Sequence, residues 1–165
     1  MTALELEALQ VRPGRRSPLG ATPSETGTNF AIASSVAEGM VLCLFDEEGR
    51  ETQVSMADYD AGVWHCFVDG VRPGQAYGFR ATGPFDPARG ARCNPAKLLL
   101  DPYARATTGT VTFGPEVLGH DVDEPDRPSA LDSADFVPRS LVVDPAFTWS
   151  DAGHRARRYA DSVLY

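Results

Sequence analysis

Residues 63–82, VWHCFVDGVRPGQAYGFRAT, decide the fold of this chain. Two apolar and aromatic runs, 63–68 and 75–82, flank the turn sequence DGVRPG. In the second run Tyr77 falls on one face of an extended segment and Arg80 on the other, as in a half-buried β-strand. The first run carries apolar residues on both faces, which predicts a strand covered on both sides. The stretch therefore predicts two β-strands joined by a turn.

The residues before this stretch continue the same pattern. Three further runs of strand-forming residues occur at 29–36 (NFAIASSV), 40–45 (MVLCLF) and 51–56 (ETQVSM), separated by turn sequences such as AEG and DEEGR. Strands that recur about every ten residues, with turns between them, are typical of an antiparallel β-sandwich. Neither a Rossmann nor a P-loop glycine pattern is present. We expect an all-β sandwich.

After the sandwich strands comes a proline-rich segment at 83–105, GPFDPARGARCNPAKLLLDPYAR. Its four prolines restrict the backbone and favour extended geometry in the residues before them, so we expect a stiff excursion. The leucines at 98–100 need a surface to bury against. That surface is either the sheet of this chain or a neighbouring domain. Further on, 107–113 is compatible with one more strand or with a loop.

Composition limits the class of ligand and partner. The chain has 165 residues and a net charge of −8, which disfavours nucleic acid and anionic membranes as partners and is compatible with uncharged sugars. No run approaches the length of a membrane span, and the start lacks the pattern of a secretory leader. The three cysteines have no CxxC spacing, so we expect reduced core thiols. These features predict a cytoplasmic protein.

Acidic residues are concentrated in one segment, 116–135, which carries seven acids against Arg127 alone. Its prolines and few large apolar residues predict a solvated loop. Residues 121–126, DVDEPD, lack the glycine and the closing glutamate of an EF-hand loop. His65 and His120 have no metal-ligand spacing. We expect neither a metal site nor a cofactor.

Several blocks in order point to a family. Together they closely resemble the amino-terminal module of bacterial glycogen debranching enzymes of the isoamylase type. The blocks are PLGAT (18–22), GTNFAI (27–32), VLCLFDEEGRE (41–51), GVWHCFV (62–68), PGQAYGFRATGPFDP (73–87), NPAKLLLDPYARA (94–106) and SLVVDPAFTW (140–149). The resemblance implies an immunoglobulin-like β-sandwich of carbohydrate-binding module family 48. It also implies a parent enzyme in which a (β/α)8 barrel follows the module and hydrolyses α-1,6 branch linkages.

The resemblance divides the chain into three parts. We expect an N-terminal extension at 1–17, the sandwich module at 18–150, and at 151–165 a linker and the start of the first barrel strand. Glycoside hydrolysis needs two carboxylates held on rigid supports, and the family places them on barrel strands beyond Tyr165. We therefore expect no catalytic residue and no enzymatic activity in this chain alone, and the barrel as its partner.

Two aromatic residues, Tyr77 and Phe85, are the candidates for stacking on an α-glucan such as glycogen. Glycogen-binding members of the wider family carry two tryptophans and a lysine on one face. Alignment puts Gly78 at the lysine position and Phe85 at one tryptophan position, with no tryptophan near Phe45 for the other. This departure favours a module whose surface serves the barrel.

The residues expected to pack on the barrel are Leu98, Leu99, Leu100 and Tyr103. For two polar residues of the same segment we expect local roles: Asn94 as a turn cap and Lys97 as a solvated side chain. Two other functions remain open. The first is an independent glucan-binding module that anchors the enzyme on glycogen, and the second is an immunoglobulin-like interaction domain of unrelated purpose.

Overall fold

The structure is a computed structural model that describes residues 9–146 and residue 160. In these residues the regular structure is almost entirely β, with two short 3-10 helices, η1 (Pro87–Arg89) and η2 (Pro115–Val117). The strands are β1 (Val11–Arg12), β2 (Gly20–Pro23), β3 (Gly27–Ala33), β4 (Gly39–Phe45), β5 (Glu51–Ser55), β6 (Asp58–Asp60), β7 (Val63–Asp69), β8 (Ala76–Thr82), β9 (Phe85–Asp86), β10 (Ala91–Arg92), β11 (Ala106–Thr108) and β12 (Arg139–Leu141).

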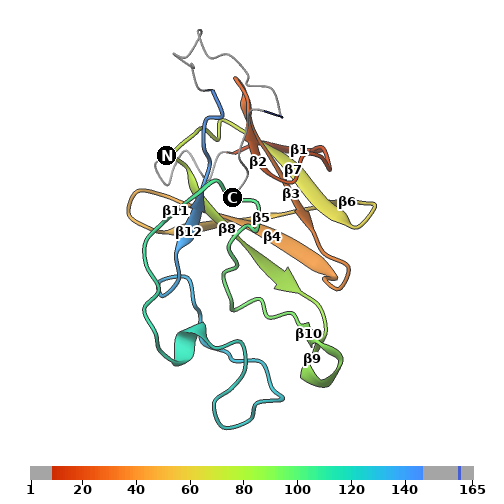
Figure 1. The fold of residues 1–165 in the computed structure, drawn as a ribbon, viewed down its shortest axis with the longest axis vertical. Helices are drawn as coiled ribbons and strands as arrows, with labels where there is room; N and C mark the ends of the chain where they lie inside the picture. The colour runs from red at the N-terminus through yellow and green to blue at the C-terminus, as the bar shows by residue number, and fades with distance from the viewer. Residues whose placement is uncertain (1–8, 147–159, 161–165) are drawn as a thin grey trace.

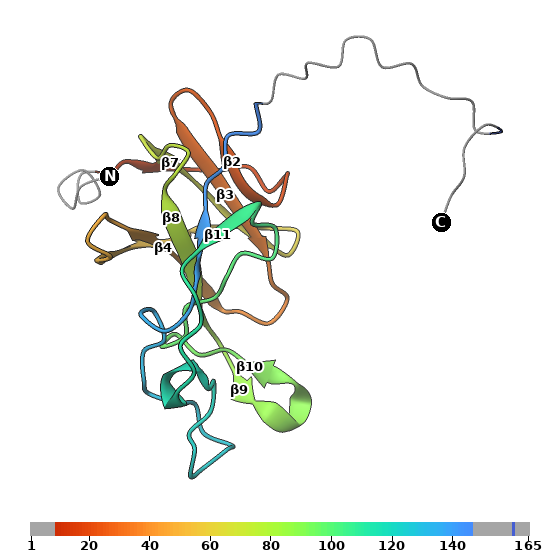
Figure 2. The ribbon, with the colours of Figure 1, turned by 60° about the vertical axis from the view of Figure 1, so that its left-hand side comes forward.

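The strands form two antiparallel sheets that pack face to face (Figure 1). The first sheet has the order β1-β7-β3-β2, with β6 also paired to β7, and the second has the order β11-β12-β8-β4-β5. Strands β9 and β10 form a separate hairpin, which Figure 2 shows beside the long loop below the sandwich. The predicted all-β, immunoglobulin-like sandwich with long proline-rich loops is confirmed.

All five strands predicted from the alternating patterns are present, as β3, β4, β5, β7 and β8. The largest difference is at 29–36, where β3 ends at Ala33. It ends there because the Ser34 hydroxyl accepts a hydrogen bond from the backbone N–H of Ala37 over 3.1 Å, which closes a turn. Of the segment 107–113, only its first two residues belong to a strand, β11.

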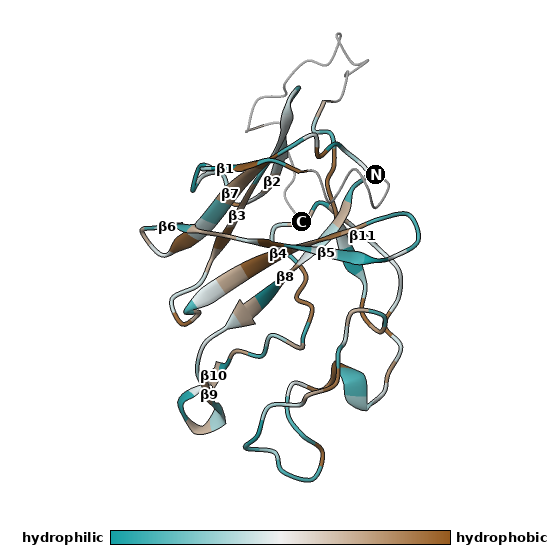
Figure 3. Cartoon of the chain, turned by 180° about the vertical axis from the view of Figure 1, so that it is seen from behind, coloured by the Kyte–Doolittle hydropathy of each residue, from teal (hydrophilic) through white to brown (hydrophobic). Residues whose placement is uncertain are grey.

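The core lies between the two sheets and is built around three aromatic rings. Phe30 from β3 meets Tyr77 from β8 edge to face, with ring centroids 5.1 Å apart. Tyr77 meets Phe79 in the same way at 5.8 Å. All three side chains are fully buried, and edge-to-face contacts of this kind add to the stabilisation from burial. Figure 3 shows hydrophobic residues along β3 and β4, which face this core.

A second, smaller cluster covers the outer face of the second sheet. Cys43 and Phe45 of β4 are buried there together with Leu98 from the proline-rich segment. The guanidinium of Arg139 lies 3.8 Å from the centre of the Phe45 ring, a cation–π contact. The outer face of this sheet is therefore covered by the chain's own loops.

Part of the segment expected to be an N-terminal extension is integrated into the sandwich. Strand β1 pairs with β7. The Asn29 side chain binds the backbone of Arg15: its Oδ1 accepts from the Arg15 N–H over 2.6 Å, and its Nδ2 donates to the Arg15 carbonyl over 2.9 Å. Arg16 pairs with Asp60 at 2.7 Å. Residues 11–17 thus belong to the module. The linker and barrel strand expected at 151–165 lie outside the described residues, apart from Ala160.

Candidate functional site

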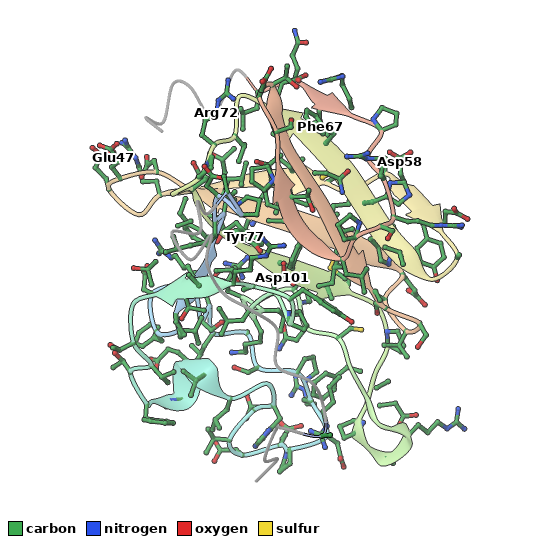
Figure 4. All side chains as sticks on the ribbon, turned by 45° about the horizontal axis from the view of Figure 1, so that its top comes forward. Glu47, Asp58, Phe67, Arg72, Tyr77 and Asp101 are labelled. Carbon is green, nitrogen blue, oxygen red and sulfur yellow. The ribbon has the colours of Figure 1, made fainter. Side chains whose placement is uncertain are left out.

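The sequence LDPYA at 100–104 is attached to the core through a buried carboxylate. The hydroxyl of Tyr77 donates to Oδ2 of Asp101 over 2.6 Å, and the backbone N–H of Tyr103 donates to Oδ1 over 2.8 Å. The backbone N–H of Asp101 donates to the Ser140 hydroxyl over 3.0 Å. Burial, and then the bond to Asp101, raise the pKa of Tyr77, so its hydroxyl remains a donor at neutral pH. Figure 4 shows Tyr77 and Asp101 together in the interior.

The three leucines before this corner have different environments. Leu99 continues the second sheet, since its N–H donates to the Phe79 carbonyl over 2.8 Å and its carbonyl accepts from the Phe79 N–H over 2.9 Å. Leu98 is only 5% exposed, because it packs on the outer face of the sheet. Leu99 and Leu100 are each 40% exposed. Leu98 therefore packs on this chain's own sheet, which corrects its expected role in packing on another domain.

An apolar groove of about 430 Å³ lies beside the two exposed leucines. Its buried lining includes Ile32, Met40 and Ala81, from strands of both sheets. Its rim is formed by Val36, Leu99 and Leu100, which are 40–51% exposed; we call these three residues the groove rim. Tyr103, which is 56% exposed, follows Pro102 of the groove lining. An apolar concavity with an exposed apolar rim is a surface suited to a protein contact.

Lys97 holds the acidic segment 116–135 at both of its ends. Its ammonium group donates to the carbonyl of Glu116 over 2.7 Å, to the hydroxyl of Ser129 over 3.2 Å and to the carbonyl of Leu131 over 2.6 Å. The side chain is buried, and this burial lowers the pKa of Lys97. The expectation of a solvated lysine was wrong, because three acceptors from a distant segment replace water around its ammonium group.

Asn94 holds the same segment and also caps its own turn. Its Oδ1 accepts from the backbone N–H of Ala96 over 2.9 Å, which confirms the predicted cap. Its Nδ2 donates to the carbonyls of Gly119 and Ser129 over 3.0 and 2.8 Å. The turn at residues 94–97 (NPAK), whose Asn94 and Lys97 line the groove, is therefore connected to the acidic segment by hydrogen bonds.

A buried arginine adds a third connection. Arg80, 5% exposed on β8, pairs with Glu51 of β5 at 2.6 Å and with Asp132 of the acidic segment at 2.9 Å. Burial alone would raise the pKa of Glu51, but hydrogen bonds, foremost that from Arg80, outweigh it and lower the pKa. The groove and the acidic segment are thus parts of one ordered unit.

The acidic residues at the tip of that segment form a turn. Oδ1 of Asp121 accepts from the backbone N–H groups of Asp123 and Glu124 over 2.9 and 3.2 Å. In the described part of the chain, no three His, Cys, Asp or Glu side chains are grouped so as to hold a metal ion. Within those same residues, no helix is long and apolar enough to cross a bilayer.

Comparison with known families identifies the fold. Residues 18–104, more than half of the chain, match the family described as carbohydrate-binding module 48 (isoamylase N-terminal domain). The chain belongs to this family. The match begins just before β2 and ends at the LDPYA corner, so the groove rim and the residues that hold the corner to β8 lie inside the module.

Curated relatives are much longer than this chain. The glycogen operon protein GlgX homolog of Mycobacterium tuberculosis is 44% identical over 158 residues, which cover 94% of this chain and 22% of the relative. The glycogen debranching enzyme of Serratia proteamaculans is 44% identical over 156 residues, covering 94% of this chain and 23% of the relative. The chain thus spans less than a quarter of the length of these relatives, as a module of such proteins does.

Solved structures share the fold at low sequence identity. The putative alpha amylase from Salmonella typhimurium matches with a TM-score of 0.50 and 21% identity, over 85% of this chain and 17% of that chain. A product complex of SpuA, a multi-modular glycogen-degrading pneumococcal virulence factor, matches with a TM-score of 0.54 and 18% identity, over 80% of this chain and 12% of that chain. Both support the sandwich fold of the carbohydrate-binding module.

Of the two residues expected to stack on sugar, the structure buries one. Tyr77 has no exposed surface and its ring lies between Phe30 and Phe79, so neither of its faces is available to a ligand. Phe85 is partly exposed on the β9–β10 hairpin and stays a candidate. Gly78, at the expected lysine position, lies under Leu98: a Cβ there would be 2.7 Å from Leu98 Cδ1.

The sequence did not reveal the residues that organise this surface. In the sequence, Asp101 stood out only as part of the proline-rich segment at 83–105, and Val36 only as the end of a predicted strand. The available signal for Asp101 was its position between a leucine run and a proline. A carboxylate buried beside apolar residues needs hydrogen-bond donors, and the backbone of a turn can supply them. Val36 carries no comparable signal.

Proposed function

We propose that this chain is the non-catalytic N-terminal module of a glycogen debranching enzyme and packs on that enzyme's catalytic (β/α)8 barrel. Family membership and the names and lengths of the relatives support this assignment. In the parent, the barrel would hydrolyse α-1,6 branch linkages while the module supports it.

The observation that carries the packing role is the exposed apolar surface around the groove. Leu99 and Leu100 are held in place by the sheet and by the LDPYA corner, yet each remains 40% exposed, and Tyr103 is 56% exposed. Apolar side chains fixed at a surface lose contact with water when a second domain covers them, which stabilises both domains. Their rigidity lowers the entropic cost of that contact.

The test compares the thermal midpoint of this chain with that of a longer chain that continues through the region present in the relatives. The module should unfold at a higher temperature in the longer chain, and Leu100→Ser should reduce that increase. The matched control is Val122→Ser, because Val122 is 60% exposed on the acidic segment and does not line the groove. Equal midpoints for the module in both chains would contradict a packing role.

A second candidate function is independent glucan binding, which the family description and the partly exposed Phe85 favour. Titration of the chain with glycogen or maltoheptaose tests it. Saturable binding that Phe85→Ala abolishes would support an anchoring module over a packing one.

We also propose a cytoplasmic location. Cys43, Cys66 and Cys93 are all free and buried, and unpaired cysteines are typical of proteins from reducing compartments. Disulfide mapping of the protein from its native cell tests this: any pairing among the three would argue against it.

A further inference from the structure

We propose that an amphipathic α-helix of the catalytic domain fills the groove, and that an acidic residue of this helix pairs with Arg92. The proposal rests on the packing role proposed above and names the kind of element that makes the contact. Three properties of the groove support it: the hydrogen bonding of its backbone, its apolar rim and the charge at its edge.

The backbone around the groove has few hydrogen-bond donors left for a partner. Four of the lining residues already use their backbone N–H groups within the chain: Ser34, Cys93, Lys97 and Leu99. Pro102, also in the lining, has no N–H group. An extended peptide binds by pairing its backbone with a free strand edge, which these five residues do not offer. A helix forms its backbone hydrogen bonds internally and binds through its side chains, so a helix suits this surface.

The proposed partner presents helices on its outside. In a (β/α)8 barrel each strand is followed by a helix, and the helices form the outer ring that a neighbouring domain meets. An amphipathic helix binds a hydrophobic groove through apolar side chains at positions i, i+3, i+4 and i+7. The groove rim surrounds a concavity of about 430 Å³ with exposed apolar side chains, so it has room for the projecting side chains of such a helix.

One positive charge at the edge of the groove has no partner. The lining contains two cationic side chains, Arg92 and Lys97, and no acidic one. The Lys97 ammonium group already donates to three acceptors of the acidic segment. Arg92 is exposed on β10 and makes no ion pair within the described residues. An acidic residue on the bound helix would pair with Arg92 and fix the helix in one register.

The chain that follows the module is long enough to reach the groove. Asp144 and Pro145 lie beside Ser24, at the end of the sandwich where β3 begins, whereas the groove lies where β3 ends, at Ile32. The seven residues of β3 span about 23 Å. The sequence continues for 19 residues after Ala146, and a chain of that length spans up to about 60 Å when extended.

The experiment places the photo-crosslinking residue p-benzoylphenylalanine at Val36 or Leu100 of the longer chain, which continues through the region present in the relatives. Mass spectrometry identifies the residues that each position captures. We expect captured residues three or four positions apart in one downstream segment, with an Asp or Glu on the same face. The control position is Val122, which is 60% exposed and does not line the groove. It should capture none of these residues.

Arg92→Glu tests the ion pair in the same longer chain. It should reduce the increase in the module's thermal midpoint by about 2–4 °C, whereas Arg92→Lys should keep most of the increase. Neither should change the midpoint of the 165-residue chain, in which the partner is absent. Arg89→Glu is the matched control, because the Arg89 side chain is 86% exposed between β9 and β10 and does not line the groove.

Captured residues that alternate two positions apart would overturn the helix, as would captures scattered over several segments. Equal effects of Arg92→Glu and Arg89→Glu on the midpoint would overturn the ion pair. If neither position captures a downstream residue although the longer chain stabilises the module, this proposal fails and the packing role belongs to another surface. Equal midpoints of the module in both chains contradict the packing role itself.

Discussion

The Tyr77 hydroxyl donates to Asp101 Oδ2 over 2.6 Å, and both side chains are buried. The bond joins the start of β8 to a corner 24 residues further along the chain. Because Asp101 also accepts from the backbone of Tyr103, the same carboxylate positions an exposed aromatic residue beside the groove. The core strand and the proposed docking surface are thus connected through one carboxylate.

Replacing the hydroxyl that makes this bond should destabilise the module. In Tyr77→Phe the ring still fills the core, but Asp101 keeps one donor fewer in a buried site, so we expect a loss of about 1–3 kcal/mol in the free energy of unfolding. Urea denaturation measures it. Tyr103→Phe is the control, since Tyr103 is exposed and only its backbone takes part in the corner. A Tyr77→Phe variant as stable as the wild type would show that the bond does not anchor the corner.

Gly78 should tolerate no side chain, although it is in a strand. A Cβ at this position would be 2.7 Å from Leu98 Cδ1 and 3.1 Å from the Leu99 carbonyl oxygen, so the segment that covers the sheet must move. We expect Gly78→Ala to lower the free energy of unfolding by about 1–3 kcal/mol. Gly119→Ala is the comparison, because a Cβ there meets nothing within 4 Å. Similar free energies of unfolding for the two variants would mean that Leu98 does not pack tightly against Gly78 of β8.

The strands were predictable because their evidence is local. Alternation of apolar and polar residues fixes which side chains face the core, so Tyr77 was correctly put on one face of the strand and Arg80 on the other. The same alternation did not reveal that Tyr77 is fully buried. That depends on the facing sheet, which contributes Phe30, and on Asp101, which satisfies the hydroxyl.

The residues that were misjudged are those with distant partners. Lys97 looks solvated because its neighbours are small or apolar, yet its three acceptors lie 19 to 34 positions away. Residues 11–17 look like a tail because Pro, Gly and Arg dominate them, yet Asn29 and Asp60 hold them on the sheet. Hydrogen bonds between remote segments leave no periodic pattern in a sequence.

Removing the ammonium group of Lys97, the single lysine of the chain, should loosen the acidic segment. Lys97→Met keeps the length of the side chain but leaves one buried and two partly buried hydrogen bonds without their donor, so we expect a loss of about 2 kcal/mol. Amide hydrogen exchange should become faster across 116–135 and change little in β3 and β4. Arg89→Met is the control, as the Arg89 side chain is 86% exposed. Unchanged exchange in 116–135 would contradict the role assigned to Lys97.

Stability should fall at alkaline pH because buried thiols resist ionisation. Burial raises the pKa of Cys66 from 9.0 to about 12, so between these values the unfolded chain releases a proton that the folded chain retains. The stabilisation is complete below pH 9.0 and is lost as pH rises toward 12, with a slope of about 1.4 kcal/mol per pH unit for one group.

The measurement is urea denaturation under reducing conditions at about pH 7 and about pH 10.5 for the wild type and Cys66→Ala. The variant should be less stable at the lower pH through lost packing, and its stability should decline less on going to the higher pH. Burial also raises the pKa of Cys43, so the variant keeps part of the decline. An identical decline in both proteins would exclude Cys66 as a source.

The turn between β6 and β7 offers a stabilising substitution. Ala61 has a φ of 49° and Gly62 a φ of 83°, and a side chain in the left-handed region is disfavoured where glycine is not. Ala61→Gly should therefore raise the free energy of unfolding by about 0.5–1 kcal/mol. Ala106→Gly in β11 is the opposite control: its φ is not positive, so the added backbone freedom should destabilise. If Ala61→Gly also lowers the free energy of unfolding, the left-handed conformation of Ala61 does not destabilise the folded chain.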